Sequence, residues 1–133
     1  MMEINRADVL AEVTAAFERY EHALVANDVA VLDELFWEDE RVVRFGTDES
    51  LYGFEAVKRF RSARPAGDLE RTLVRTTITT FGDSAATTAV EFRRHHSGRC
   101  GRQSQTWIRT VAGWRIVAAH ISVRDDEPAR DGP

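Results

Sequence analysis

An arginine in the middle of an apolar segment is the first residue of this sequence whose type points to chemistry. Within VVRFGTDESLYG (Val42–Gly53), Arg44 stands between Val43 and Phe45. Alternation along a strand places Arg44 on the opposite face from those two side chains. A buried guanidinium cannot discharge itself by losing a proton, so it requires an anion beside it. Three interpretations are open: an internal salt bridge with Glu91 as a candidate partner, an exposed edge strand, or a ligand carboxylate held by the guanidinium fork.

A tyrosine could supply an acid to the same pocket. Val9, Val13, Phe17, Tyr20 and Leu24 recur at intervals of three or four residues, which predicts the apolar stripe of an amphipathic helix. The Tyr20 ring should therefore face the sheet, where structural tyrosines are common. In a pocket, its hydroxyl could instead donate a proton to a leaving group or polarise a carbonyl. An adjacent arginine would favour the ionised form and make this hydroxyl a better acid.

Further polar side chains lie on segments that are expected to border this pocket. Each one alone is typical of a satisfied core group or a solvated face, but together they suggest a cavity with polar walls. They are Glu91, Gln103, Gln105 and His120 on predicted strands, and Arg61 and Arg64, one helical turn apart before Pro65.

Other chemistries find little support in the sequence. His95 and His96 fall at a predicted turn without partners at metal-ligand spacing, so no metal or cofactor is expected. Nothing marks a histidine base for Cys100, which favours a bystander thiol over a nucleophile. There is no GxSxG elbow and no phosphate loop. The formal net charge of -4 outweighs the basic and aromatic segments FRRHH and QTWIRT and argues against a nucleic-acid partner.

Composition predicts a cytoplasmic globular protein. The 133 residues are 43% hydrophobic and 30% charged, as in ordinary globular domains. We expect a single domain over residues 1–124 and a disordered tail over residues 125–133, DDEPARDGP. No apolar run approaches the roughly 20 residues that span a bilayer, and the start has no signal-peptide pattern, so no membrane partner is expected. A single cysteine fits a reducing compartment.

The elements that must position these side chains are three helices followed by four long strands. Asn5 and Asp28 are candidate N-caps of the first two helices. The pattern predicts helices around Val9–Leu24 and Val29–Phe36, a short strand over Arg41–Phe45, a GTDES loop, a helix from Gly53 to Pro65, and strands near 71–81, 85–94, 99–110 and 114–124. This order predicts an α+β fold, with helices on one face of a curved antiparallel meander and a pocket at the mouth between them.

These segments resemble a known family. The order of elements, closed by WRIVAAHIS, resembles the NTF2-like (SnoaL-like, cystatin-like) superfamily. More narrowly, FERYEHAL, VVRFGTDESLYG, FRSARP, TTFG, EFRR and GRQSQTWIR resemble the AtzH/HpxZ-like family, in the same order from about Val9 to Val123. The resemblance implies a cone: a strongly bent, mostly antiparallel sheet wrapped on three N-terminal helices. It also implies a homodimer formed through the outer face of the sheet.

The resemblance also implies two functions. The AtzH branch is a decarboxylating amidohydrolase of cyanuric acid catabolism that converts dicarboxyurea to allophanate, without metal or cofactor. Its catalytic tyrosine and arginine correspond to Tyr20 and Arg44. The residues that would bind the rest of the substrate are Tyr52, Arg61, Arg64, Glu91, Gln105 and His120. The HpxZ branch, associated with oxalurate and purine catabolism, supplies the alternative: a non-catalytic protein that binds a small carboxylate. A ketosteroid-isomerase-like reading ranks last, because that chemistry requires an aspartate base in an apolar cavity.

Overall fold

The computed structural model describes residues 1–124, and the predicted tail lies outside the described residues. The helices are α1 (Ala7–Ala26), α2 (Val29–Leu35) and α3 (Phe54–Ala63). The strands are β1 (Val43–Phe45), β2 (Ser50–Tyr52), β3 (Arg71–Phe81), β4 (Ala85–Arg94), β5 (Cys100–Thr110) and β6 (Gly113–Val123). None of the helices in this part of the chain is both long and apolar enough to cross a bilayer.

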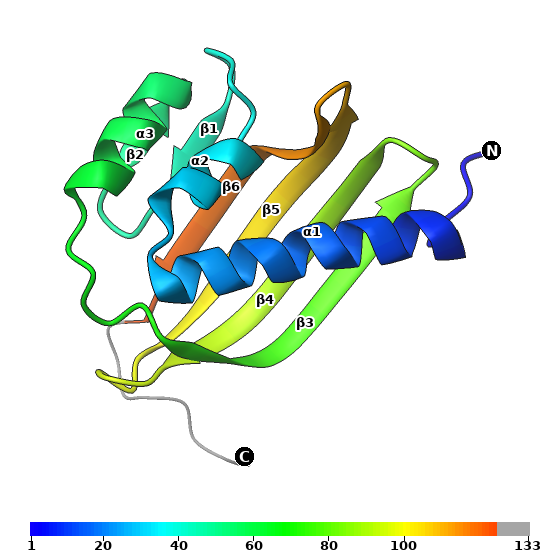
Figure 1. Cartoon of the computed structure of the whole chain (residues 1–133). Coiled ribbons are helices and arrows are strands. Elements are labelled where there is room, and N and C mark those ends of the chain that lie inside the picture. Colours follow the sequence, from blue (N-terminus) through cyan, green and yellow to red (C-terminus); the bar gives the residue numbers. More distant parts are fainter. Residues whose placement is uncertain (125–133) are drawn as a thin grey trace.

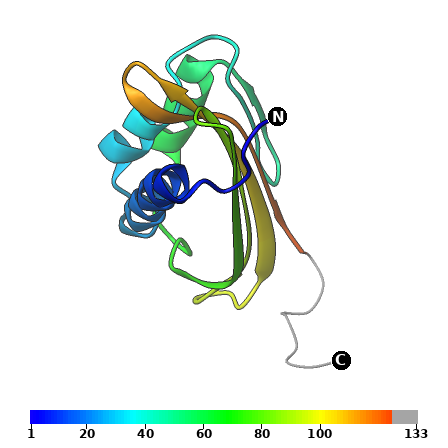
Figure 2. The same ribbon diagram turned by 90° about the vertical axis from the view of Figure 1, so that its right-hand side faces the viewer.

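The strands form one mixed, mostly antiparallel sheet in the order β2-β1-β6-β5-β4-β3. The four long strands make the predicted antiparallel meander, while β1 runs parallel to β6 at the other end. Figures 1 and 2 show the helices on one side of a curved sheet, with α1 lying across its inner face. The predicted α+β class and its arrangement of layers are therefore confirmed.

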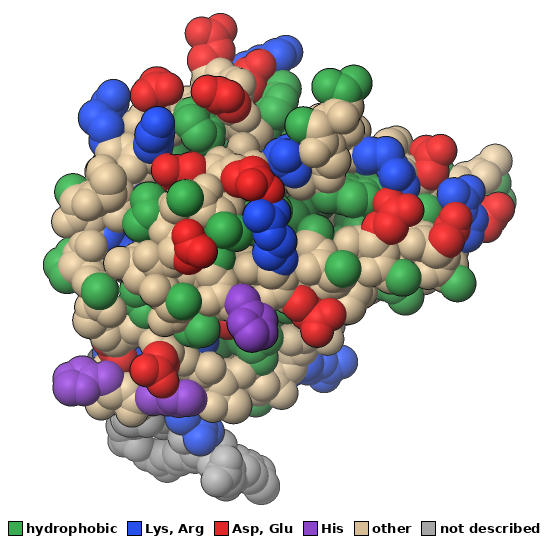
Figure 3. Space-filling view, in the orientation of Figure 1, with side chains coloured by type: hydrophobic (Ala, Val, Ile, Leu, Met, Phe, Trp, Pro, Cys, Tyr) green, Lys and Arg blue, Asp and Glu red, His purple; other side chains and the backbone are tan. Residues whose placement is uncertain are grey.

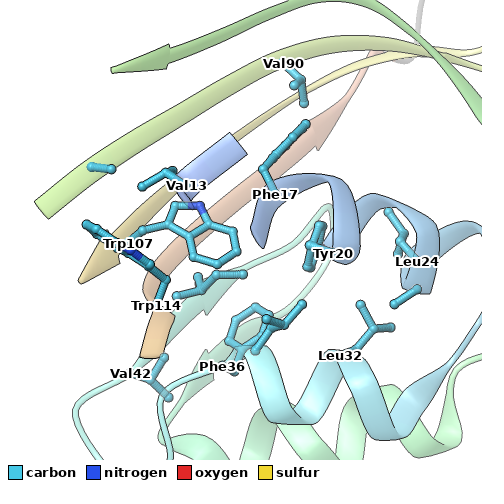
Figure 4. Close-up of a cluster of buried hydrophobic side chains, with 14 of the residues drawn as sticks. Val13, Phe17, Tyr20, Leu24, Leu32, Phe36, Val42, Val90, Trp107 and Trp114 are labelled. Atoms are coloured by element: carbon cyan, nitrogen blue, oxygen red, sulfur yellow. The ribbon is translucent and has the colours of Figure 1, made fainter. Parts of the chain in front are cut away.

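The apolar stripe of α1 is buried against the sheet, as its spacing predicts (Figure 4). Val13 and Phe17 pack in the same cluster as Trp107 of β5 and Phe36, which follows α2. Burying aromatic side chains of this size contributes much of the stability of a small domain. Tyr20 belongs to this stripe, so the helix that builds the core also carries the candidate acid.

Two local details differ from the sequence-based expectations. The N-cap of α1 is Arg6 and not Asn5, which has a φ of 57°. Asn5 instead accepts a hydrogen bond from the Thr80 amide through its side-chain oxygen at 2.8 Å, because the segment before α1 pairs with β3. Asp28 caps α2 as predicted, by accepting from the Val31 amide at 3.3 Å.

Candidate active site

A cavity of about 480 Å³ opens between the C-terminal half of α1, the end of α3 and the inner face of the sheet. The polar side chains that carry the argument below and line it are Tyr20, Arg44, Glu49, Arg64, Arg71, Arg94 and Gln103. Acidic and basic side chains are interspersed over the surface that carries α1 (Figure 3). Four arginines (Arg44, Arg64, Arg71 and Arg94) and three carboxylates (Asp48, Glu49 and Asp68) line the cavity, so its wall carries an excess of one positive charge on a molecule whose overall charge is negative.

Arg44 points from β1 toward the helices, because it pairs in register with Ala119 on the inner face of β6. Its residue is only 8% exposed. The Nη1 atom donates to Glu49 Oε1 at 3.0 Å, and the guanidinium lies 5.1 Å from the centre of the Phe60 ring. An internal salt bridge therefore exists, but its partner is Glu49 and not the candidate Glu91. One nitrogen of the guanidinium fork makes this bond, and the same side chain still lines the cavity.

Arg64 is a half-buried cation without a carboxylate partner in the described part of the chain. It is the C-cap residue of α3, and its Nε and Nη2 atoms are buried with no hydrogen-bond partner among residues 1–124. Burial lowers the pKa of its guanidinium; the Tyr20 phenol opposes this shift, while Arg44 and Arg61 add to the lowering. A buried cation in such surroundings gains most from an anion that comes from outside the protein.

The far wall of the cavity is built on one aromatic ring. The guanidinium of Arg71 lies 4.4 Å, and that of Arg94 5.8 Å, from the centre of the Phe92 ring. Arg71 is held by Glu21 through two hydrogen bonds of 2.8 and 2.7 Å. Burial lowers the pKa of Arg94, whose cation lines the same cavity. Phe92 thus contacts two positive charges on β3 and β4, which are separated from the Arg44 strand β1 by β5 and β6 in the sheet order.

Two neutral donors complete the cavity. Tyr20 is 4% exposed, and its hydroxyl makes no hydrogen bond to another residue in the described part of the chain. Gln103 accepts from Arg71 Nη2 at 3.4 Å, and its Nε2 atom is buried without a partner there. Unsatisfied donors in a cavity favour a ligand rich in acceptor oxygens, such as carboxylates and carbonyls.

The structure does not bring Tyr52, Glu91 or His120 to this cavity. Tyr52 is 66% exposed on β2, and its ring packs on Phe45 with centres 5.9 Å apart. The ring of His120 contacts the other side of Phe45 at 5.8 Å, on the outer face of the sheet. Glu91 is exposed on that outer face because its neighbours in β4 face the core. The expectation that these side chains share a hollow with Tyr20 and Arg44 is therefore corrected.

Arg61 and Gln105 are buried, but each is bound inside the protein and does not line the cavity. Arg61 donates to Asp33 at 2.9 Å and lies 4.6 Å from the Phe36 ring centre. Gln105 accepts from the Thr88 hydroxyl at 3.0 Å, and that hydroxyl in turn accepts from the Trp107 indole. Both side chains therefore belong to polar contacts of the core.

Sequence reasoning did not select Glu49, Arg71 or Arg94 for the site. Glu49 lies five positions after Arg44, in the loop between β1 and β2. A loop has no regular alternation, so the sequence does not predict the direction of its side chains. Arg71 and Arg94 pair directly across β3 and β4, so the pairing register of the strands could have revealed them. That register depends on a bulge between Leu73 and Arg75, and the sequence pattern does not predict this bulge.

The fold and its cavity place the protein in the class of NTF2-like, cystatin-like domains. An NTF2-like superfamily protein from Salmonella enterica serovar Typhimurium aligns with a TM-score of 0.71 at 24% identity, covering 95% of both chains. This likeness shows the fold alone.

The AtzH-like family model matches residues 2–127, so the chain belongs to the AtzH-like family. A protein of unknown function from Pectobacterium atrosepticum is 57% identical, with a TM-score of 0.89 over 92% of this chain and 95% of that one. A cystatin-like fold protein from Burkholderia xenovorans is 43% identical, with a TM-score of 0.88 over 92% and 97% of the two chains. The comparison with curated proteins found no match.

Proposed function

We propose that the cavity binds a small N-carboxylated urea and removes one carboxylate from its nitrogen, as in the conversion of dicarboxyurea to allophanate. Arg44 anchors a carboxylate, and Tyr20 acts as general acid. The observation that carries this proposal is that Tyr20, Arg44 and Arg64 line one cavity in which Arg64 has no carboxylate partner among the described residues. Membership of the AtzH-like family supports the choice of substrate class.

The distribution of charge supports a ligand with two anionic ends. Arg44 and Arg64 come from β1 and the end of α3, while Arg71 and Arg94 come from β3 and β4. A dicarboxyurea offers two carboxylates and a central carbonyl, which are all acceptors. The unpartnered Nε2 of Gln103 is a suitable donor for one of these oxygens. This assignment keeps Arg64 and replaces the other expected binding residues, Tyr52, Arg61, Glu91, Gln105 and His120.

The reaction needs one proton and no covalent intermediate. The Tyr20 hydroxyl protonates the nitrogen while the bond from that nitrogen to the carboxylate carbon breaks. The electron pair of this bond stays on nitrogen, and the carboxylate leaves as carbon dioxide. Allophanate remains, and the tyrosinate recovers a proton from solvent. Rate enhancement comes from orientation and from positive charge placed where negative charge moves.

Replacing Tyr20 with phenylalanine tests the role of the acid. We expect Tyr20→Phe to lower kcat for carbon dioxide release from dicarboxyurea by about 100-fold or more, because a positioned acid contributes a factor of this size. Binding of glutarate, a stable dicarboxylate of similar span, should be unchanged, since the anion site keeps its arginines. The measurement is allophanate formation above the spontaneous rate, beside a glutarate titration.

Three results of this experiment are informative. Normal turnover by Tyr20→Phe would exclude Tyr20 as the acid. Glutarate binding that is lost in Arg44→Ala, in a protein that turns over no urea derivative, would favour the non-catalytic carboxylate-binding alternative. Unchanged glutarate binding by Arg44→Ala would contradict the anion anchor itself.

A further inference from the structure

Glu49 already holds the position on Arg44 that a ligand carboxylate would take. Its Oε1 atom lies 3.0 Å from Arg44 Nη1, and both side chains line the cavity. The Glu49 side chain is 21% exposed and that of Arg44 10% exposed, so the carboxylate lies on the more solvent-accessible side of the pair. An ion pair at the edge of solvent is weaker than a buried one and can exchange partners.

A glycine makes this position of Glu49 possible. The Gly46 amide donates to the Glu49 carbonyl at 2.9 Å, which closes the turn between β1 and β2. A Cβ atom added at Gly46 would lie 1.5 Å from Glu49 Oε1. Because the clash involves the end of a flexible side chain, an alanine at this position would move the carboxylate at little cost to the fold. The absence of a side chain at Gly46 therefore leaves room for the Glu49 carboxylate to fold back over the turn and reach Arg44.

We propose that Glu49 is an internal competitor for the carboxylate site of Arg44, and that a ligand carboxylate must displace it to reach Nη1. This inference rests on the proposed function, in which Arg44 receives a carboxylate of the ligand. A tethered carboxylate has an effective concentration in the millimolar range or above. Weak external anions therefore compete poorly, and a product that keeps one carboxylate is released more readily when Glu49 returns. Glu49 thus sets an affinity threshold and does not touch the reacting bond.

Two variants should remove the competitor by different means. Glu49→Gln removes its charge, while Gly46→Ala leaves the charge and displaces the side chain. We expect each variant to bind acetate and glutarate more tightly, by about tenfold and by the same factor for both, because the same displacement step is removed. KM for the urea substrate should fall, while kcat stays equal or decreases as product release slows. NMR titration with acetate and glutarate gives the affinities.

The chain offers a matched control for each variant. Asp48→Asn removes one negative charge from the same loop and cavity wall without removing a contact to Arg44. Gly67→Ala adds a methyl group to the cavity wall where no atom lies within 4 Å. Both controls should bind acetate and glutarate as the wild-type protein does.

Three outcomes would overturn the inference. The first is an equal gain in Asp48→Asn, which would show a general charge effect. The second is an increase in glutarate affinity that equals the square of the increase in acetate affinity. A general charge effect would act on each carboxylate of the ligand and would give this result. The third is weaker binding in Glu49→Gln, which would make Glu49 part of the ligand site.

The inference and the proposed function fail separately. If the wild-type protein consumes the carboxylated urea while Glu49→Gln and Gly46→Ala bind both anions as the wild type does, the competitor is refuted and the enzyme stands. If both variants gain affinity but no protein shows turnover, the competitor stands and the enzymatic function is refuted. Absence of carboxylate binding in every protein would refute both.

Discussion

At the scale of single residues, Arg61 and Arg64 have opposite surroundings although they lie one helical turn apart. Arg61 is 3% exposed and is neutralised by Asp33 at 2.9 Å. Arg64 has two buried nitrogens without a partner among the described residues and lines the cavity. Removing one partner of a buried ion pair destabilises the fold because the other charge is left uncompensated, whereas a charge that is unpaired from the start opposes folding until a ligand arrives. The first arginine therefore serves the core, and the second serves the cavity.

This contrast predicts two distinct phenotypes. Arg61→Ala should lower the free energy of unfolding by about 3 kcal/mol, because it leaves Asp33 as an uncompensated carboxylate in a mostly buried site. Arg64→Ala should leave stability unchanged or raise it, and weaken glutarate binding by tenfold or more. Urea unfolding and a glutarate titration of both variants measure the two effects. Loss of stability in Arg64→Ala without loss of binding would contradict the assignment.

The placement of side chains was predictable from sequence only where one face of a strand is clearly apolar. Alternation correctly separates Arg44 from Val43 and Phe45, and it places Glu91 opposite Val90 and Phe92. It does not say which face the helices cover. On β6 both faces carry small side chains, and Val117 is left out of the pairing with β5 by a bulge. The inner face of that strand carries Ala119 and Ile121, which leaves His120 outside.

At the scale of elements, β4 and β5 are joined tightly beneath the Phe92 ring. Phe92 pairs directly with Gly101. A Cβ atom at Gly101 would lie 2.3 Å from Phe92 Cζ and 2.5 Å from the Ser122 carbonyl oxygen. The ring can occupy its position only because this glycine leaves room, and the ring supports the Arg71 guanidinium. Gly101 therefore affects the position of the Arg71 guanidinium through the Phe92 ring.

We expect Gly101→Ala to destabilise the protein by about 1–3 kcal/mol, because the backbone oxygen of Ser122 cannot yield as a flexible side chain can. It should also weaken glutarate binding by shifting Phe92 and the Arg71 guanidinium. Gly67→Ala is the control, since a methyl group there meets no atom within 4 Å. Thermal unfolding of both variants checks the prediction, and equal melting temperatures would refute it.

The long elements were predictable because their patterns extend over many residues, whereas β2 was not. The segment Ser50–Tyr52 has only Leu51 partly buried on the inner side, so no alternation distinguishes it from a loop. It is a strand because β1 pairs with it antiparallel, with Arg44 opposite Leu51. Tertiary pairing of this kind decides short strands more than local preference does.

At the scale of the whole molecule, the outer face of the sheet is left uncovered by the helices (Figure 2). Its centre carries small exposed side chains in register, with Thr77 opposite Ala89 and Ala89 opposite Ser104. Charged side chains border this centre, with Arg75 opposite Glu91 and Glu91 opposite Arg102. A centre of small groups bordered by paired charges suits a symmetric contact with a second copy, as the family resemblance implies.

We therefore expect a homodimer with twice the mass of the 15.1 kDa chain. Ala89→Glu should give a folded monomer, because the two-fold axis would bring a pair of introduced carboxylates together. Ala15→Glu, at an exposed position of α1, should remain dimeric. Light scattering after size-exclusion chromatography measures the masses. A wild-type monomer, or a dimeric Ala89→Glu, would contradict this use of the outer face.

The parallel pairing of β1 with β6 has a consequence for the order in which the protein becomes competent during synthesis. The strand that carries Arg44 borders β6 on one side and β2 on the other, and β6 ends at Val123. A nascent chain that still lacks β6 has the guanidinium on β1, but it lacks the strand that joins β1 and β2 to the rest of the sheet. Closure of so distant a pairing comes late in folding, since the loop between the partners must first lose its freedom. Ligand recognition therefore arises only after β6 has left the ribosome.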